Sequence, residues 1–405
     1  MKNTILILLA ASPILRAGSP ESVITPPPSQ GNWIKPLIDI RARYEFADID
    51  RKGDSNAFTV RERLGLQTTA WNGFSALVEG EFTQAAIDEY NGGAAGATPF
   101  SPTHAIIADP ETNELNQGYI QYSGYDMVAK IGRQRIIYDN SAFIGNVGWR
   151  QNEQTYDAFS VAGKWIDSLT INYAYINQVN RIFGSDAVKN FGYVDSDTHL
   201  LNLSYTGIKG LKLGGYAYLM KFDKKPNWDN NTFGISAAKT FAGIDFYGEL
   251  AWQDDAGFAS NKDAFYTHVT ATKAFGTQSL TVGVESLGAG FKTPLATNHA
   301  FNGYADAFVA GRSEGNHNGV TDTYVSHTLP VFWGMKWTNV FHAFGDNEIS
   351  TGYGFEYDSV LIKKFDDNFT AIAKFAYFES EGDPFVGAAA LPDIGRVSVE
   401  LDYKF

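Results

Sequence analysis

The sequence predicts an all-β fold, a transmembrane antiparallel β-barrel of about 18 strands, with 16 as the alternative count. Three observations lead to this prediction. Apolar residues recur at every second position along segments of about 9–13 residues, close to the length of a tilted strand that crosses a bilayer. Tight turns and long polar or Gly-rich loops join these segments alternately. The chain also ends in an alternating segment whose last residue is Phe405.

The composition agrees with a membrane barrel and excludes several other classes of protein. The 405 residues include 44% hydrophobic and 14% aromatic side chains, 40 Gly and no Cys. The absence of Cys excludes a disulfide framework, and a formal net charge of −13 argues against nucleic acid as a partner. No apolar run of about 18 residues follows the N-terminal segment, which excludes a helical membrane anchor. The apolar content is therefore distributed over strands.

The N-terminal segment predicts export. Lys2 precedes an apolar stretch, and we expect residues 1–17 to be a secretory signal peptide that is cleaved after Ala17. Residues 18–32 are rich in Pro and Ser and have the composition of a linker. Residues 33–405 then form a single transmembrane barrel domain.

Alternation assigns the two faces of each expected strand. In the first strand, apolar side chains at even positions from 38 to 46 alternate with charged ones at odd positions from 39 to 45. Because every backbone polar group in lipid needs an internal partner, such a sheet has to close. The last strand places Leu401, Tyr403 and Phe405 on one face. This ending resembles the signal that the outer-membrane barrel assembly machinery reads, so we expect that machinery as a partner.

The connections between strands predict the orientation in the membrane. Short turns on the periplasmic rim and long extracellular loops are typical of barrels in the outer membrane of Gram-negative bacteria. Several of the turns are flanked by Trp or Phe, as an aromatic girdle requires. The expected tight turns are residues 71–73, 165–167, 207–210, 241–243, 275–277 and 365–368, and the expected long loops are residues 86–114, 136–153, 180–197, 254–262, 288–320 and 380–393.

A barrel of this size predicts a pore, since barrels of about 16–18 strands leave an aqueous channel. Guanidinium groups bind carboxylates in a bidentate manner, so arginines on the polar face would attract anions. An alternative interpretation is that acidic residues of the wall pair with these arginines, which then have a structural role. The expected lumen-lining residues are Arg41, Arg43, Arg61, Arg63, Glu79, Glu81, Arg133, Arg135 and Arg150.

Alternation breaks down in residues 132–159, between two expected strands. The stretch is dense in Arg, Gln and Asn and is too long for a tight turn. We expect residues 136–153 to fold inward and constrict the pore. The expected constriction residues are Asp139, Asn140, Asn146, Gln151, Asn152 and Glu153.

The same stretch resembles the alginate export family of outer-membrane porins. The matching elements are Gly132-Arg133-Gln134-Arg135, Gly145-Asn146 and Trp149-Arg150-Gln151-Asn152-Glu153-Gln154 with Asp157, and upstream the Arg-bearing strands and Asn116-Gln117-Gly118-Tyr119. The resemblance covers residues 37–165. It implies a monomeric barrel of about 18 strands with an electropositive lumen that passes an anionic polysaccharide or its oligomers.

We therefore expect a passive channel for anionic saccharides or other small anionic solutes, without enzymatic activity or a cofactor. A general or organic-acid-preferring porin is the first alternative, and an adhesin or purely structural barrel is another. A barrel enzyme is disfavoured, because His268 and His342 have no evident Ser partner. Asp48, Asp50 and Asp54 offer ligands for a surface Ca²⁺ at most, since Lys52 occupies a ligand position.

Overall fold

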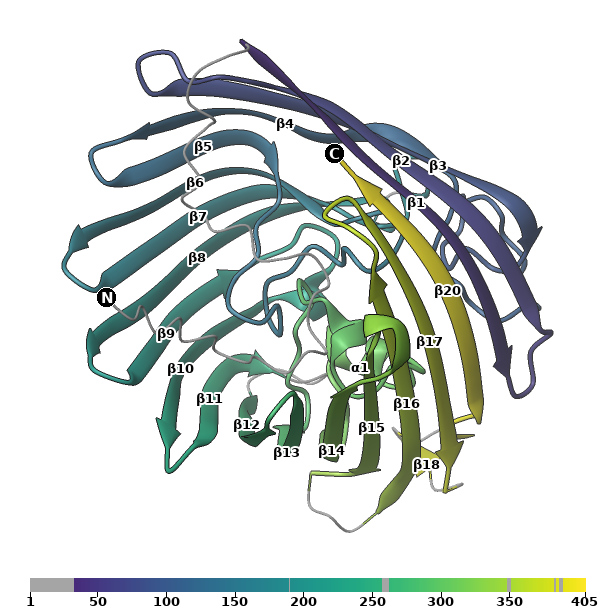
Figure 1. Cartoon of the computed structure of the whole chain (residues 1–405). Helices are drawn as coiled ribbons and strands as arrows, with labels where there is room; N and C mark the ends of the chain where they lie inside the picture. Colours follow the sequence, from purple (N-terminus) through teal and green to yellow (C-terminus); the bar gives the residue numbers. More distant parts are fainter. Residues whose placement is uncertain (1–32, 189, 257–261, 348–350, 382–383, 386–388) are drawn as a thin grey trace.

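The computed structural model describes residues 33–188, 190–256, 262–347, 351–381, 384–385 and 389–405. The expected signal peptide and linker lie outside the described residues. Eighteen strands form one sheet, in which each strand is antiparallel to the next and the last pairs with the first. Figure 1 shows the resulting barrel, with the purple first strand beside the yellow last strand. The expected barrel of 18 strands is therefore confirmed.

The strands of the wall run between 8 and 16 residues. They are β1 (Ile34–Ile49), β2 (Ser55–Thr68), β3 (Phe74–Glu89), β4 (Thr112–Gly124), β5 (Met127–Gln134), β6 (Thr155–Ile166), β7 (Leu169–Asn180), β8 (Tyr193–Ile208), β9 (Leu211–Met220), β10 (Asn230–Phe241), β11 (Ile244–Ala256), β12 (Lys262–Phe275), β13 (Gln278–Leu287), β14 (Val320–Pro330), β15 (Lys336–Gly345), β16 (Gly352–Lys364), β17 (Phe369–Ser380) and β20 (Ile394–Lys404).

The remaining elements are short and lie in the connections. A separate two-stranded sheet pairs β18 (Pro384–Phe385) with β19 (Ala389–Ala390). The helical elements are α1 (Val309–Glu314) and the 3-10 helices η1 (Pro226–Trp228), η2 (Asn298–Ala300) and η3 (Phe332–Gly334). None of the described helices has the length and apolar character needed to span a membrane.

The alternation in the sequence becomes the inner and outer surfaces of the barrel. In β13, Leu280, Val282 and Val284 are between 39% and 48% exposed, whereas Thr281 and Glu285 are each 2% exposed. The apolar side chains therefore face outward and the polar ones face the interior. This arrangement inverts that of a water-soluble protein, because the solvent of the outer surface is lipid.

The first and last strands close the barrel. The N–H of Ile38 donates to the carbonyl of Phe405 at 3.1 Å, and the N–H of Phe405 donates to the carbonyl of Ile38 at 2.8 Å. Leu401, Tyr403 and Phe405 lie on the outer face, between 39% and 62% exposed. Their recognition by an assembly machinery stays a prediction.

Tight turns join the strands on one rim. At Ala242-Gly243 both residues have positive φ, 52° and 71°, as the two-residue hairpin turns that match strand twist require. Tyr125-Asp126 makes a turn of the same kind, with φ of 53° and 56°, which the sequence analysis did not identify. Exposed aromatic side chains flank several turns, as expected for a girdle: Trp71, Trp165, Phe241 and Phe275.

Two connections fill much of the interior. The β5–β6 loop (residues 135–154) and the β13–β14 loop (residues 288–319) both enter the barrel, and α1 of the second loop is visible inside it in Figure 1. Phe143 from the first loop contacts Phe291 from the second, and their ring centroids are 6.0 Å apart. Both rings belong to an apolar cluster with Tyr216 and Tyr266 of the wall. The lumen therefore has a packed core of its own.

Candidate functional site

The β5–β6 loop enters the lumen because β5 is short. β5 has 8 residues, and its pairing with β4 stops at Gly118 and Arg133. Beyond this point the chain turns away from the wall and returns at Thr155. Gln151, Asn152 and Glu153 at the end of the loop are at most 2% exposed. The loop thus packs against the inner wall as a polar insert.

The four arginines of β1 and β2 lie together on the inner wall, where the register places Arg41 opposite Arg61. All four are at most 7% exposed. Each has a carboxylate partner, as when Arg41 Nε lies 2.7 Å from Asp402 Oδ1. The ion pairing that the sequence analysis left open is therefore present. The other pairs are Arg43 with Glu45, Arg61 with Asp39, and Arg63 with Glu81.

Three of these arginines, Arg41, Arg43 and Arg63, hold the backbone of the β5–β6 loop. Arg41 Nη1 donates to the carbonyl oxygens of residues 148, 149 and 150 at 3.1–3.2 Å. Arg43 Nη1 donates to the carbonyl of Trp149 at 2.8 Å, and Arg63 Nη2 donates to that of Gln151 at 3.2 Å. A guanidinium has five N–H donors, so one arginine can satisfy both a carboxylate and a loop carbonyl. These arginines therefore position the loop.

Glu79 of β3 binds Arg135, the first residue of the β5–β6 loop. Its Nη2 lies 2.7 Å from Glu79 Oε1, and its Nε lies 2.5 Å from Glu153 Oε1. Asn116 donates to both carboxylates. Burial by itself would raise the pKa of Glu153. The charges of Arg135 and Arg63 outweigh burial and lower the pKa to about 2. Glu153 is therefore ionised at neutral pH and links β2, β4 and the loop.

The other charged contact of the loop is Arg150. Its Nη1 lies 2.9 Å from Glu45 and 3.4 Å from Asp109, and its Nη2 lies 3.4 Å from Asp306. Arg150 thereby connects β1, the β3–β4 connection and the β13–β14 loop. Its own charge is compensated by three carboxylates.

The expected constriction residues are mostly held by hydrogen bonds to neighbouring elements. Asp139 accepts from Asn202 of β8 at 2.6 Å, and the amide of Asn146 donates to Glu153 at 2.7 Å. Asn152 receives hydrogen bonds from hydroxyl groups of β3 and β4. Asn140 accepts from the N–H of residue 142 within the loop, and Gln151 donates to residue 59 of β2. Their role in solute passage stays a prediction.

Arg133 is a correction to the expected lumen lining. It shares the outer face of β5 with Ile131, which is 61% exposed. Its guanidinium binds Asp157 of β6 at 2.7 and 3.1 Å and donates to the carbonyl of Leu115 on β4 at 3.1 Å. Since β5 ends here, Arg133 bridges the two strands on either side of it.

The β13–β14 loop packs against the β5–β6 loop inside the barrel, a contact that was not predicted from the sequence. The N–H of Gly145 donates to Leu295 at 2.8 Å, and the N–H of Thr297 donates to Ser141 at 3.0 Å. The ring of Trp149 stacks on that of His299, with centroids 3.2 Å apart. The apolar residues of this segment were an available signal, because a loop exposed to water would not contain so many. They are Phe291, Leu295, Phe301 and Phe308.

Acidic residues of β13–β16 anchor this second loop. Glu285 binds Arg312 of α1 at 2.8 Å. Backbone N–H groups of the loop donate to Glu356 at 2.7 Å and to Asp358 at 3.1 Å. The carboxylates on these strands therefore accept hydrogen bonds from the protein itself.

The histidines of this wall have no Ser partner among their recorded contacts in the described chain. His268 Nε2 lies 2.9 Å from the hydroxyl of Tyr324, and His342 Nδ1 lies 3.0 Å from Asp322. These contacts give no support to the alternative of a barrel enzyme.

The expected ligands of a surface Ca²⁺ lie around one exposed connection. Asp48, Asp50 and Asp54 are exposed around the β1–β2 connection. Within the residues that the structure describes, no three His, Asp or Glu side chains are grouped as a metal site.

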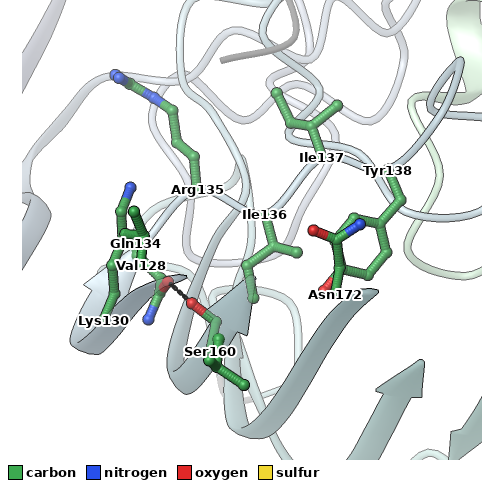
Figure 2. Close-up of a pocket in the computed structure, with 10 residues that line it drawn as sticks. Val128, Lys130, Gln134, Arg135, Ile136, Ile137, Tyr138, Ser160 and Asn172 are labelled. Carbon is green, nitrogen blue, oxygen red and sulfur yellow. Dashed lines mark hydrogen bonds between the residues drawn. The ribbon is translucent and has the colours of Figure 1, made fainter. Parts of the chain in front are cut away.

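Two cavities adjoin the β5–β6 loop. The first contains about 510 Å³ of empty space and is lined by Lys130, Arg135 and uncharged residues of β5, β6 and β7. Figure 2 shows Gln134 and Ser160 hydrogen-bonded at its edge, with Ile136 and Tyr138 following along the loop. Lys130 and Ile131 are consecutive residues of an alternating strand and therefore point to opposite faces. The sequence could thus have identified Lys130 as an inward-facing residue.

The second cavity contains about 250 Å³ of empty space and lies between the two loops and the wall. Its charged lining residues are Arg43, Glu45, Lys374 and Arg396. Lys374 of β17 and Arg396 of β20 were not predicted as site residues. Both occupy inward positions of alternating strands, so parity again was the available signal.

Comparison with known proteins agrees with this architecture. The model of the Alginate export family matches residues 33–279, more than half of the chain. No curated protein sequence matches. OccAB4 of Acinetobacter baumannii is similar in structure, with 12% identity, a TM-score of 0.67 and coverage of 93% of this chain and 99% of that one. OpdK, an outer membrane protein of Pseudomonas aeruginosa, is 11% identical with a TM-score of 0.67, covering 92% of this chain and 98% of its own.

The structural likeness concerns the fold, and the family match concerns the chain itself. The match includes the arginine wall, the β5–β6 loop and the first cavity. A closed barrel with lipid-facing apolar residues agrees with that assignment. The protein is therefore an outer-membrane β-barrel channel that belongs to the alginate export family.

Proposed function

We propose that this channel passes small anionic solutes by diffusion, with carboxylated saccharides as the preferred class. The observation that carries the proposal is the charge of the two cavities beside the β5–β6 loop. The first is lined by two cations and no acid, and the second by three cations and one acid. Counted over the lining residues alone, each set has a formal charge of +2, and Glu79, Glu153 and Glu400 behind the lining pair with some of these cations. Such sites raise the local concentration of anions because walls of low dielectric constant focus the field.

The arginine wall contributes indirectly to this field. Arg41, Arg43 and Arg63 are buried and paired, so carboxylates already compensate most of their charge. They hold the loop in place instead, and the loop carries Arg135 to the edge of the first cavity. In this proposal a permeating carboxylate meets Lys130 beside amide and hydroxyl groups that can bind sugar hydroxyls, and Arg135, which is shared with Glu79 and Glu153, lies at the edge of the same cavity.

A general or organic-acid-preferring porin is a second candidate. The pairing of the wall arginines favours it, since buried ion pairs leave little charge for recognising a polymer. The small size of the two cavities favours it as well, because a saccharide would need to pass in an extended form. The two candidates differ in whether solutes other than saccharides block the pore equally well.

Recordings in planar bilayers test the proposal. Under a KCl gradient the reversal potential should indicate anion preference, and Lys130→Gln should reduce it. Arg133→Gln is a matched control, because it removes a cation of the same strand that faces outward. Cation preference of the native channel would overturn the proposal. Block by a uronate trisaccharide, with no block by a neutral one, would favour saccharides, and equal block by benzoate would favour the second candidate.

A further inference from the structure

Hydrogen-bonding atoms without a partner surround the second cavity. Arg43 Nε, Trp149 Nε1 and His299 Nε2 are buried and have no hydrogen-bond partner in the described part of the protein. The three side chains are 2%, 8% and 6% exposed, and all three line the same cavity. Burial of a polar group without a partner is costly and uncommon. Three such atoms around one space indicate that the space binds something polar.

The three side chains that carry these atoms are packed against one another. The rings of Trp149 and His299 are stacked with centroids 3.2 Å apart, and the guanidinium carbon of Arg43 lies 5.1 Å from the centroid of Trp149. The remaining donors of Arg43 are occupied by Glu45 and by the carbonyl of Trp149. The guanidinium of Arg43 is therefore held in place through its other nitrogens, and only its Nε–H lacks an acceptor.

The chemistry of each atom defines what could bind. Arg43 Nε and Trp149 Nε1 each carry a hydrogen and can only donate. His299 Nδ1 lies 2.8 Å from Asp306, to which it donates. Burial lowers the pKa of His299 to about 4, so the ring is neutral at physiological pH. Its Nε2 then has a free lone pair and accepts. The site offers two donors and one acceptor.

The charge of the cavity adds a second requirement. Lys374 and Arg396 line it besides Arg43, and Glu45 is the one acidic lining residue. Glu45 pairs with Arg43 and Arg396, and Glu400 lies 3.9 Å from Lys374, so carboxylates already compensate part of this charge. A bound group with negative charge adds to that compensation. A carboxylate supplies two oxygens for the two donors, and a neighbouring hydroxyl supplies the hydrogen that the acceptor requires.

We propose that this cavity binds a carboxylate with an adjacent hydroxyl group, as in a 2-hydroxy acid such as lactate or an aldonic acid such as gluconate. The carboxylate accepts hydrogen bonds from Arg43 and Trp149, and the hydroxyl donates to His299. The proposal deepens the proposed function, on which it rests, because the solute reaches the cavity through an anion-permeable lumen. It makes the aromatic stack of the two inward loops a recognition element for the solute.

Binding measurements on the purified full-length protein in detergent test this proposal. Titration calorimetry would compare lactate, propionate, gluconate and chloride. Propionate lacks the hydroxyl of lactate and should bind about fivefold more weakly, because one hydrogen bond is lost. Gluconate that binds more tightly than lactate would assign the site to sugar acids with a 2-hydroxyl, and equal affinities would assign it to small hydroxy acids. Both outcomes support the hydroxy-carboxylate site.

A conservative variant isolates the donor of Trp149. Trp149→Phe keeps an aromatic ring on His299 and removes the N–H, so lactate should bind about tenfold more weakly. Trp228→Phe is the matched control, since Trp228 is also buried with an unpartnered Nε1 but does not line this cavity. Its affinity for lactate should equal that of the native protein. A heat-modifiability gel verifies that both variants fold.

Several results would overturn the proposal. Equal affinities for lactate and propionate would remove the role of the hydroxyl, and competition by chloride at the same concentration would reduce the site to general anion binding. Absence of lactate binding in a channel that still prefers anions in bilayers would refute this subsite and leave the proposed function standing. Loss of both properties would refute the two together.

Discussion

At the scale of single residues, position in a strand was predictable and bonding partners were not. Parity placed Arg41 and Arg43 on the inner face, where the structure has them. The partner of Arg41 is Asp402, which is 361 residues away in the sequence. Its other acceptors are loop carbonyls, which have no sequence signature because every residue has one. Alternation along a strand therefore predicts which face of the sheet a side chain occupies. Only the folded chain determines its bonding partners.

Replacement of Arg63 should expose the cost of an unpaired buried charge. Arg63→Met keeps the volume of the stem but leaves Glu81 without its principal cation. Removing one member of a buried pair typically costs about 3–5 kcal/mol, so the free energy of unfolding in urea should fall by that order. The double variant Arg63→Met/Glu81→Gln should recover much of the loss. Equal stability of the native and single-variant proteins would contradict this view.

The neutral state of His299 should make stability depend on pH. Burial lowers its pKa from 6.5 to about 4, so the unfolded chain binds more protons between these values and stability falls as the pH falls. Between pH 7 and pH 4.5 the native protein should lose roughly 2 kcal/mol more than His299→Asn, which has no titratable group there. Urea unfolding at both pH values measures the difference. Parallel pH profiles for the two proteins would exclude this role.

At the scale of elements, alternation identified the strands but failed where the chain leaves a strand. Arg133 and Arg135 are two residues apart and were expected on one face. β5 ends at Gln134, so Arg133 stays on the outer wall while Arg135 follows the loop inward. The turn at Tyr125-Asp126 was missed because its first residue is Tyr, which rarely adopts positive φ, although Asp126 tolerates it. Both errors concern the ends of β5.

The contact between the two inward loops should determine the width of the open path. A Cβ added at Gly145 would lie 2.3 Å from Thr297 Oγ1 and 2.9 Å from Thr297 N. Gly145→Val should therefore separate the loops, and single-channel recordings should give a larger and noisier conductance. Gly248→Val is the control, because no atom lies within 4 Å of its added Cβ. Unchanged conductance in Gly145→Val would mean that the loops do not limit the current.

At the scale of the whole molecule, the barrel wall was more predictable from the sequence than the packing inside the lumen. Strand length, turn spacing and the final alternating strand predicted a barrel of the observed size. The interior depends on loops that approach from opposite sides, and nothing in the sequence separation of Leu295 and Gly145 predicts their contact. The net charge of −13 likewise did not predict the charge of the interior. Acidic residues of the wall accept hydrogen bonds from the protein's own N–H groups. The linings of the two cavities contain more basic than acidic side chains.

Closure of the barrel assigns a particular role to its last residue. Phe405 exchanges two backbone hydrogen bonds with Ile38 at the seam and presents its ring outward, 62% exposed. A barrel in lipid has to pair its last edge, so we expect the outward aromatic of this strand to guide that step during assembly. Phe405→Ser should lower the folded, heat-modifiable fraction in the outer membrane several-fold. Phe365→Ser, which removes a similarly exposed ring at a turn, should lower it much less, and an equal loss in both variants would attribute the effect to the aromatic girdle rather than to the seam.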